Sequence, residues 1–97
     1  MTIEKKMNGN RAEMSLAGWM DTENAPLLAE ALDGLGPETE SLVLDLAGLE
    51  YTSSAGIRQI VATHKRMKGA LTLRHVCPEI MDVLRMTGLD RKLNIEP

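Results

Sequence analysis

Three hydroxyl residues stand in a row at Thr52, Ser53 and Ser54, between a strand-like run and a helix-like run. A hydroxyl at such a junction can cap the helix, because it accepts a hydrogen bond from the unpaired amide groups of the first turn. One serine suffices for a cap, so the cluster exceeds what capping requires. The start of a helix carries about half a positive charge and several amide donors, which makes it a natural seat for a phosphate. We therefore predict a phosphorylation switch at Ser54, with Ser53 and Thr52 as alternative acceptors.

A serine hydrolase is the competing interpretation, and residue spacing argues against it. The nucleophile motif Gly-x-Ser-x-Gly would need glycine at position 52, where the chain has threonine. His64 lies roughly 15 Å from Ser54 along the same expected helix, which is beyond hydrogen-bond reach. His75 has no evident orienting acid in the sequence. With two histidines and one cysteine, Cys77, we expect no zinc site, and we expect a non-enzyme without a cofactor.

The first third of the chain predicts a hairpin followed by a helix. The Asn-Gly pair in residues 8–10 predicts a turn between strands at 2–7 and 11–17, at a sheet edge. A helix is expected to begin near residues 22–24, whose side chains can cap it, and to end at residues 34–37.

The middle of the chain predicts a strand–helix–strand unit around the hydroxyl cluster. The run Ser41 to Gly48 is apolar on both faces except at Asp45, as expected of a central strand. Apolar residues recur at helical spacing after Ser54, basic residues fill the last turn, and Gly69 ends the helix. Residues 70–76 predict a strand parallel to the first, joined by a right-handed crossover.

The last part of the chain completes an α/β pattern. A third helix is expected to open at Pro78 and to stop at Gly88, and Leu93 and Ile95 predict a short extended segment. The order β-β-α-β-α-β-α indicates a small mixed β-sheet with helices packed on it. At 97 residues, we expect one domain covering 1–97.

Composition narrows the choice of partners. The formal net charge is −3 without an extended basic stripe, so nucleic acid is not an expected partner. Residues 1–10 lack the apolar core of a signal peptide, and no apolar run is long enough to span a bilayer. We therefore expect a cytoplasmic protein without direct membrane insertion. Aromatic residues are limited to Trp19 and Tyr51, so the core must come from aliphatic residues and methionine.

Three segments in the right order carry a resemblance to a known family. The segment LVLDLAGLEYTSSAGIRQIV, residues 42–61, resembles the core of the STAS domain of bacterial anti-sigma factor antagonists. LAGWMDTENAPLL, residues 16–28, is similar to that family's Gly-x-Leu-Asp segment, with Met20 at the usual leucine position. VLRMTGLDRKLNI, residues 83–95, is similar to its Leu-x-x-Thr-Gly-Leu ending.

The resemblance implies a regulatory binding protein controlled by phosphorylation. It implies that the unphosphorylated protein binds an anti-sigma factor serine kinase and frees a sigma factor. The resemblance also implies that phosphorylation at Ser54 ends that binding and that a PP2C-type phosphatase reverses it. We expect a monomer or weak dimer. The partner-binding residues that we predict on this basis are Asp21, Thr22, Ser53, Ser54, Gly56, Ile57 and Arg58.

Several alternatives stay open at this stage. Ser53 stands where many relatives have aspartate, which removes a charge beside the switch. STAS subunits also accompany ABC-type lipid transporters, where they regulate an ATPase without phosphorylation, and the Ser-Ser-Ala-Gly sequence is compatible with that role. Asp21 can cap the first helix or lie at the partner-facing rim, and Asp45 can accept amide hydrogen bonds beneath the Ser54 turn. Arg58, at i+4 from Ser54, can pair with a phosphate there or remain solvated.

Overall fold

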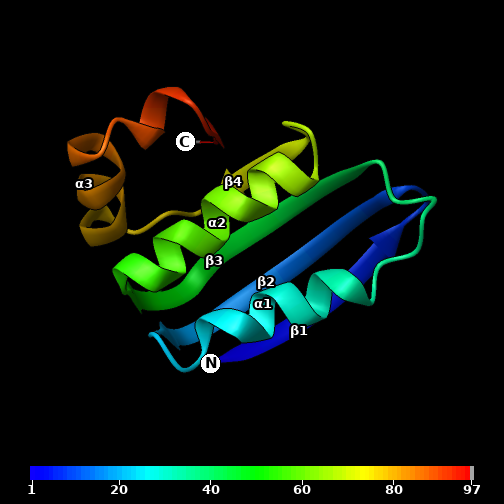
Figure 1. The fold of residues 1–97 in the computed structure, drawn as a ribbon, viewed down its shortest axis with the longest axis horizontal. Helices are drawn as coiled ribbons and strands as arrows, with labels where there is room; N and C mark the ends of the chain where they lie inside the picture. The colour runs from blue at the N-terminus through cyan, green and yellow to red at the C-terminus, as the bar shows by residue number, and fades with distance from the viewer. Residues whose placement is uncertain (97) are drawn as a thin grey trace.

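The computed structural model describes residues 1–96 and contains one five-stranded sheet with the order β1-β2-β3-β4-β5 (Figure 1). β1 pairs antiparallel with β2, and all the other neighbours are parallel. The predicted mixed α/β sheet is therefore confirmed. The elements along the chain are β1 (Thr2–Asn8), β2 (Arg11–Met20), α1 (Ala25–Asp33), β3 (Ser41–Thr52), α2 (Ser54–Arg66), β4 (Leu71–Arg74), α3 (Pro78–Met86), the 3-10 turn η1 (Leu89–Arg91) and β5 (Asn94–Ile95).

The β1–β2 hairpin lies at the sheet edge, as predicted. Gly9 in its turn has a φ of +62°, a left-handed conformation that glycine adopts without a steric penalty. In β2, buried residues alternate with more exposed ones, so Ala12, Met14 and Leu16 all face the core. This alternation is typical of a strand with one covered face.

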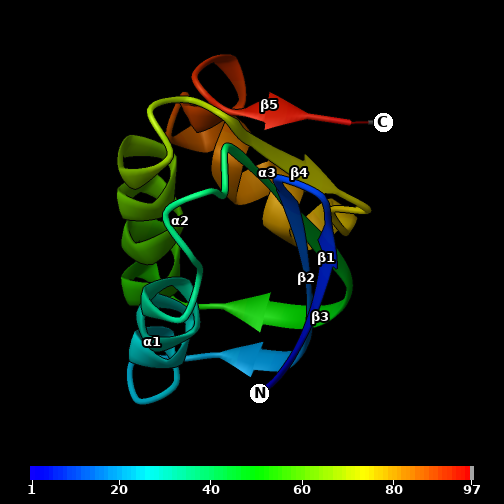
Figure 2. The same ribbon diagram turned by 90° about the vertical axis from the view of Figure 1, so that its right-hand side faces the viewer.

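Helices α1 and α2 lie side by side over one face of the sheet, while α3 contacts η1 and β3 (Figure 2). Leu28 and Leu32 of α1 and Ile60 of α2 are fully buried between the helices and the sheet. Burial of each such side chain contributes about 1.5–3 kcal/mol. Arg66 of α2 also bonds Asp33 of α1 at 2.7 Å, which links the far ends of the two helices. The aliphatic and methionine core expected from composition is confirmed.

Strand β3 is longer than predicted, because it continues from Gly48 to Thr52 instead of ending at Gly48. Its pairing with β2 shifts twice, once opposite Ser15–Ala17 and again opposite Gly18–Trp19, and each shift inserts one extra residue into β3. Such bulges bend a strand while its pairing continues. Gly48 pairs with Ala17 directly after the first bulge, and Glu50 is the extra residue of the second.

The parallel unit formed by β3, α2 and β4 is confirmed, with β4 shorter than the predicted 70–76. His75 adopts a φ of +57°, so the backbone turns there and the strand stops at Arg74. The third helix begins at Pro78 as predicted, and Gly88 follows it with a φ of +74°. β5 confirms the short final extended segment.

Candidate functional site

The three hydroxyls lie where β3 ends and α2 begins, and the structure gives each a different environment. Ser53 is the N-cap of α2: its backbone is extended, and its Oγ accepts a hydrogen bond from the Gly56 amide at 3.2 Å. The same Oγ lies 3.3 Å from the carbonyl oxygen of Met20 and donates to it. The Ser53 hydroxyl is thus engaged both as donor and as acceptor.

Ser54 is the first residue of α2 and is exposed. Among residues 1–96, its hydroxyl has no hydrogen-bond partner, whereas the half-buried Thr52 donates to the Ser53 carbonyl at 3.2 Å. Ser54 therefore offers the most accessible hydroxyl of the cluster, at the positively polarised end of a 13-residue helix.

The end of β2 meets the start of α2 at one carbonyl group. The Met20 oxygen accepts the Ser53 amide at 2.9 Å, because Met20 and Thr52 are register partners. The next residue, Asp21, accepts the Asn24 amide at 2.8 Å through Oδ1, and its own carbonyl accepts the Ala25 amide at 2.9 Å. Asp21 therefore stabilises the turn that precedes α1. The N-cap of α1 is Asn24, and its side chain makes no capping bond and donates to the Trp19 carbonyl instead, so the expected capping of α1 by the side chains of residues 22–24 is corrected. Because β2 and β3 run parallel, their carboxyl ends lie together, and α1 and α2 both begin at this end of the sheet.

The predicted partner-binding residues divide into a surface group and a buried group. Thr22, Ser54 and Arg58 are exposed, and Asp21 and Ser53 are half-buried at the same edge. Arg58 forms no ion pair in the described part of the chain, so its guanidinium remains available. Gly56 and Ile57 are buried beneath the turn.

Gly56 serves the packing of α2 against the strand ends. A Cβ atom at this position would overlap Thr52 Oγ1 and would lie 2.9 Å from the Met20 carbonyl oxygen. The missing side chain therefore lets the first turn of α2 approach the backbone of β2. A glycine can permit the close approach of a neighbouring backbone or of a partner protein. Gly56 permits the close approach of the β2 backbone.

Two expectations about charged residues are corrected. His75 does have an acidic neighbour: its Nδ1 lies 3.0 Å from Asp45 Oδ1, a contact that sequence separation concealed. Asp45 also accepts the Ala47 amide at 3.0 Å, so it supports a bulge of β3 rather than the Ser54 turn. Partial burial opposes ionisation, but the hydrogen bonds from Ala47 and His75 outweigh it and hold the pKa of Asp45 below its ordinary value.

A hydrolytic site does not result from this pair. Within the part of the chain that the structure describes, no serine hydroxyl bonds to His64 or His75. Among the same residues, no group of three or more histidine, cysteine, aspartate or glutamate side chains is arranged to hold a metal ion.

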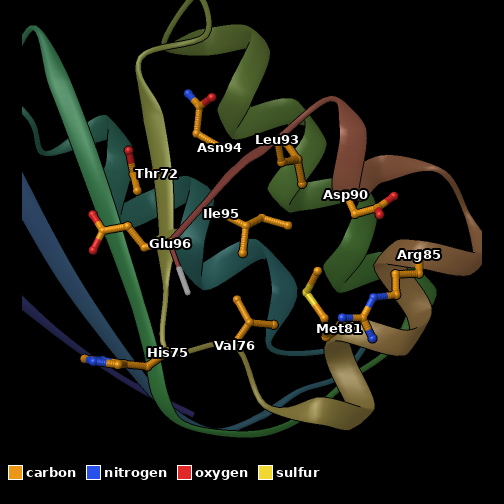
Figure 3. A pocket seen from close by; sticks show the side chains of 10 residues that line it. All are labelled: Thr72, His75, Val76, Met81, Arg85, Asp90, Leu93, Asn94, Ile95 and Glu96. Atoms are coloured by element: carbon orange, nitrogen blue, oxygen red, sulfur yellow. The ribbon is translucent and has the colours of Figure 1, made fainter.

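A groove of about 900 Å³ lies away from the hydroxyl turn, between β4, β5, α3 and η1. Figure 3 shows Val76, Met81 and Ile95 directed into it, while His75 points away from them. The groove is open and holds none of the predicted site residues. The hydroxyl turn is therefore separate from this groove.

Sequence reasoning missed an aromatic pair beside the turn. Trp19 and Tyr51 are register partners at the ends of β2 and β3, with ring centroids 5.8 Å apart. Their exposed fractions are 60% and 49%. Composition identifies both only as scarce aromatic residues, because their adjacency depends on a strand register that the sequence does not reveal.

With this geometry established, comparison with known proteins identifies the family. The chain matches the family model described as "Mlab, STAS domain" over residues 3–96, and it belongs to the STAS domain family. It is 29% identical over 98 residues to the anti-sigma-B factor antagonist of Bacillus subtilis (strain 168), covering 98% of this chain and 90% of that protein. Members that act as anti-sigma factor antagonists are regulatory binding proteins, and we describe this chain as a binding protein rather than an enzyme.

Solved structures share the fold. An anti-sigma factor antagonist from Mycobacterium paratuberculosis is similar with a TM-score of 0.87 and 23% identity, covering 99% of this chain and 85% of that one. The Bacillus cell fate determinant SpoIIAA in its phosphorylated form is similar with a TM-score of 0.72 and 12% identity, covering 99% and 92%. None of the helices in residues 1–96 combines the length and hydropathy needed to cross a bilayer.

Proposed function

We propose that this chain is an anti-sigma factor antagonist whose unphosphorylated form binds an anti-sigma serine kinase in the cytoplasm. Phosphorylation at Ser54 ends that binding and a PP2C-type phosphatase restores it. The observation that carries the proposal is the separation of roles at the turn. Ser53 caps α2 and its hydroxyl is fully engaged, whereas Ser54 is exposed and its hydroxyl has no hydrogen-bond partner in the described residues. The similarity to the Bacillus anti-sigma-B factor antagonist supports the choice of partner.

The position of Ser54 explains how a switch can act without unfolding the chain. A phosphate there would add about −1.5 to −2 charges at the start of a helix, where the helix dipole favours an anion. The cap supplied by Ser53 would remain in place, so α2 would keep its start. A partner seated on the turn would have to bury and desolvate the phosphate, which is costly. The fold would persist while docking is lost.

The surface proposed for the kinase is centred on the carboxyl ends of β2 and β3, where α1 and α2 begin. It consists of Thr22, Ser54 and Arg58 as exposed contacts, with Asp21 and Ser53 at its margin. Gly56 and Ile57 act from below by fixing the turn, since both are buried. Little rearrangement is expected on binding, because helix starts and strand ends of this kind are already rigid.

The decisive experiment incubates the protein with its cognate serine kinase and ATP. Peptide mapping by mass spectrometry should find the phosphate on Ser54, and calorimetry should find that the modified protein, like Ser54→Asp, binds the kinase at least tenfold more weakly, or about 1.4 kcal/mol. Ser15→Ala, at an exposed serine of β2, is the matched control and should bind and be phosphorylated like wild type. Phosphate on Ser53 or Thr52, or equal affinity of both forms, would refute the switch.

The alternative is a STAS subunit that regulates an ABC-type lipid transporter ATPase without phosphorylation. Two observations favour this second function. The matching family model is described as "Mlab, STAS domain". In addition, Ser53 stands where many phosphorylated relatives have an acidic residue beside the switch serine. Calorimetry with the ATPase subunit in place of the kinase separates the two functions. Binding to the ATPase alone, unaffected by Ser54→Asp, would favour the alternative.

A further inference from the structure

The two aromatic side chains of this chain lie against each other on the surface, one residue before the switch turn. Trp19 and Tyr51 are the chain's entire aromatic content apart from histidine. Their rings are 5.8 Å apart with an interplanar angle of 56°, a tilted arrangement typical of favourable aromatic pairs. The next register pair, Met20 and Thr52, leads directly into the turn that carries Ser54.

The backbone holds this pair outward. Gly18, the residue before Trp19, has a φ of +98°, a conformation that L side chains rarely adopt. The register shift after Gly18 leaves Glu50 as the extra residue of β3, and such bulges redirect the side chains that follow. Core positions on both sides are filled by Leu49 and Met20, at 1% and 0% exposure, so the aromatic rings are not required to complete the core.

The size of the exposed aromatic surface suggests that it is the centre of a larger contact. A fully covered tryptophan or tyrosine buries about 150–250 Å², so the exposed parts of the pair amount to roughly 200 Å². A stable protein interface needs about 800 Å² on each partner. Exposed polar residues follow the pair along both strands, at Thr22 after β2 and at Ser54 after β3. An apolar centre surrounded by polar groups is the usual arrangement of an interface hot spot.

The charges near the pair indicate what kind of surface covers it. Asp21, Glu23 and Glu50 lie close to the aromatic residues in the chain, and none of them forms an ion pair within residues 1–96. Arg58 is the one basic residue among those assigned to the proposed surface, so the carboxylates outnumber it. An anionic lipid surface would be repelled by these carboxylates. A symmetric contact with a second copy would bring the same carboxylates face to face. A protein with an apolar pocket and a neutral or basic rim would not be repelled by these carboxylates.

We propose that Trp19 and Tyr51 form the apolar centre of the partner-binding surface whose rim contains Ser54, and that they insert together into an apolar pocket of a protein partner. The inference rests on the proposed function for the identity of that partner, the anti-sigma serine kinase. It adds that binding energy is concentrated in the aromatic pair, while Ser54 controls whether the pair can engage.

Calorimetry on single variants tests this assignment. Trp19→Ala and Tyr51→Ala should each weaken binding of the serine kinase roughly tenfold to thirtyfold, as expected for hot-spot aromatic residues. Met7→Ala is the matched control, since Met7 is also an exposed apolar side chain, at 41% exposure. It pairs with Ala12 at the opposite end of β2, about 23 Å from Trp19 along the strand, and its replacement should change affinity less than twofold. Trp19→Ala and Tyr51→Ala should lower the urea midpoint, because each removes the ring–ring contact and the buried part of one ring, but both should remain fully folded in the absence of urea.

Further measurements separate this inference from the switch. Ser54→Asp tests the switch and Trp19→Ala tests the aromatic centre, so either can fail alone. If wild type binds the transporter ATPase subunit instead of the kinase, the proposed function fails, and the same variants measured with that subunit decide the inference. Sedimentation with phosphatidylglycerol vesicles and sedimentation velocity of the free protein should show neither lipid binding nor a dimer. Equal affinities of Trp19→Ala and Met7→Ala, loss of vesicle binding or of a dimer in Trp19→Ala, or no binding to either protein would overturn the inference.

Discussion

The Oγ atom of Ser53 accepts the amide hydrogen of Gly56 at 3.2 Å, so the serine next to Ser54 is already committed to capping α2. The two adjacent serines are therefore expected to differ in what their removal does. Ser53→Ala should lower the free energy of unfolding by about 1 kcal/mol, the usual contribution of an N-cap. Ser54→Ala should change it by less than about 0.5 kcal/mol, since its hydroxyl is exposed. Urea unfolding measures both, and equal losses would contradict the assignment of the cap to Ser53.

Gly56 should prove intolerant of any side chain. Gly56→Ala places a Cβ atom 2.9 Å from the Met20 carbonyl oxygen, and we expect a destabilisation of about 1–3 kcal/mol, with a larger loss for Gly56→Val. Ala62→Val, at an exposed position of the same helix, controls for the β-branched side chain and should cost no more than about 0.7 kcal/mol. A Gly56→Val protein as stable as Ala62→Val would show that the helix and strand can separate without cost.

Arg58 should strengthen the effect of a phosphate on Ser54. It is exposed, forms no ion pair among the described residues, and lies one helical turn from Ser54. Phosphorylation should raise the melting temperature of wild type, and Arg58→Ala should remove about 2–4 °C of that gain. Arg85→Ala, at an exposed arginine of α3, should leave the gain unchanged. Differential scanning calorimetry of matched modified and unmodified proteins gives the comparison, and an identical gain in all three would exclude an Arg58–phosphate pair.

Asp45 should make stability depend on acidity. Its pKa lies below its ordinary value despite partial burial, because Ala47 and His75 stabilise the carboxylate. The carboxylate therefore contributes stability above the pKa it has in the unfolded chain, and that contribution disappears as the pH falls through its lowered pKa in the folded protein. At pH 7, Asp45→Asn should be less stable than wild type by about 1 kcal/mol, and the two should converge in acid.

Urea titrations between pH 7 and pH 3 measure this convergence. Asp82→Asn, at an exposed carboxylate of α3, should follow wild type throughout within about 0.5 kcal/mol. If the free energies of unfolding of Asp45→Asn and wild type differ by the same amount at every pH, ionisation of Asp45 does not contribute to stability.

The sequence predicted the order and class of the elements because local signals agreed with one another. The Asn-Gly pair indicated a turn, Pro78 indicated a helix start, and the apolar residues at helical spacing after Ser54 indicated a helix. The full length of β3 could not be predicted, since its two bulges depend on pairing with β2 rather than on the composition of residues 48–52.

The site shows the same division between local and long-range information. The hydroxyl cluster and its place at a helix start were visible in the sequence, but the choice of Ser53 as the cap depends on its contact with Met20, 33 residues away. The His75–Asp45 and Trp19–Tyr51 pairs likewise join residues about 30 positions apart, through the parallel pairing of β3 with β4 and with β2. Such pairings are set by tertiary structure, so periodicity alone could not reveal them.

The position of Trp19 has a practical consequence. Because it is the chain's one tryptophan and is 60% exposed beside the Ser54 turn, its fluorescence reports on this edge of the molecule with no contribution from the core. Emission maxima and acrylamide quenching can therefore follow coverage of the edge by a tryptophan-free partner in the unlabelled, unmutated protein. The same chromophore is a poor probe of global unfolding, since it is already largely hydrated in the native state.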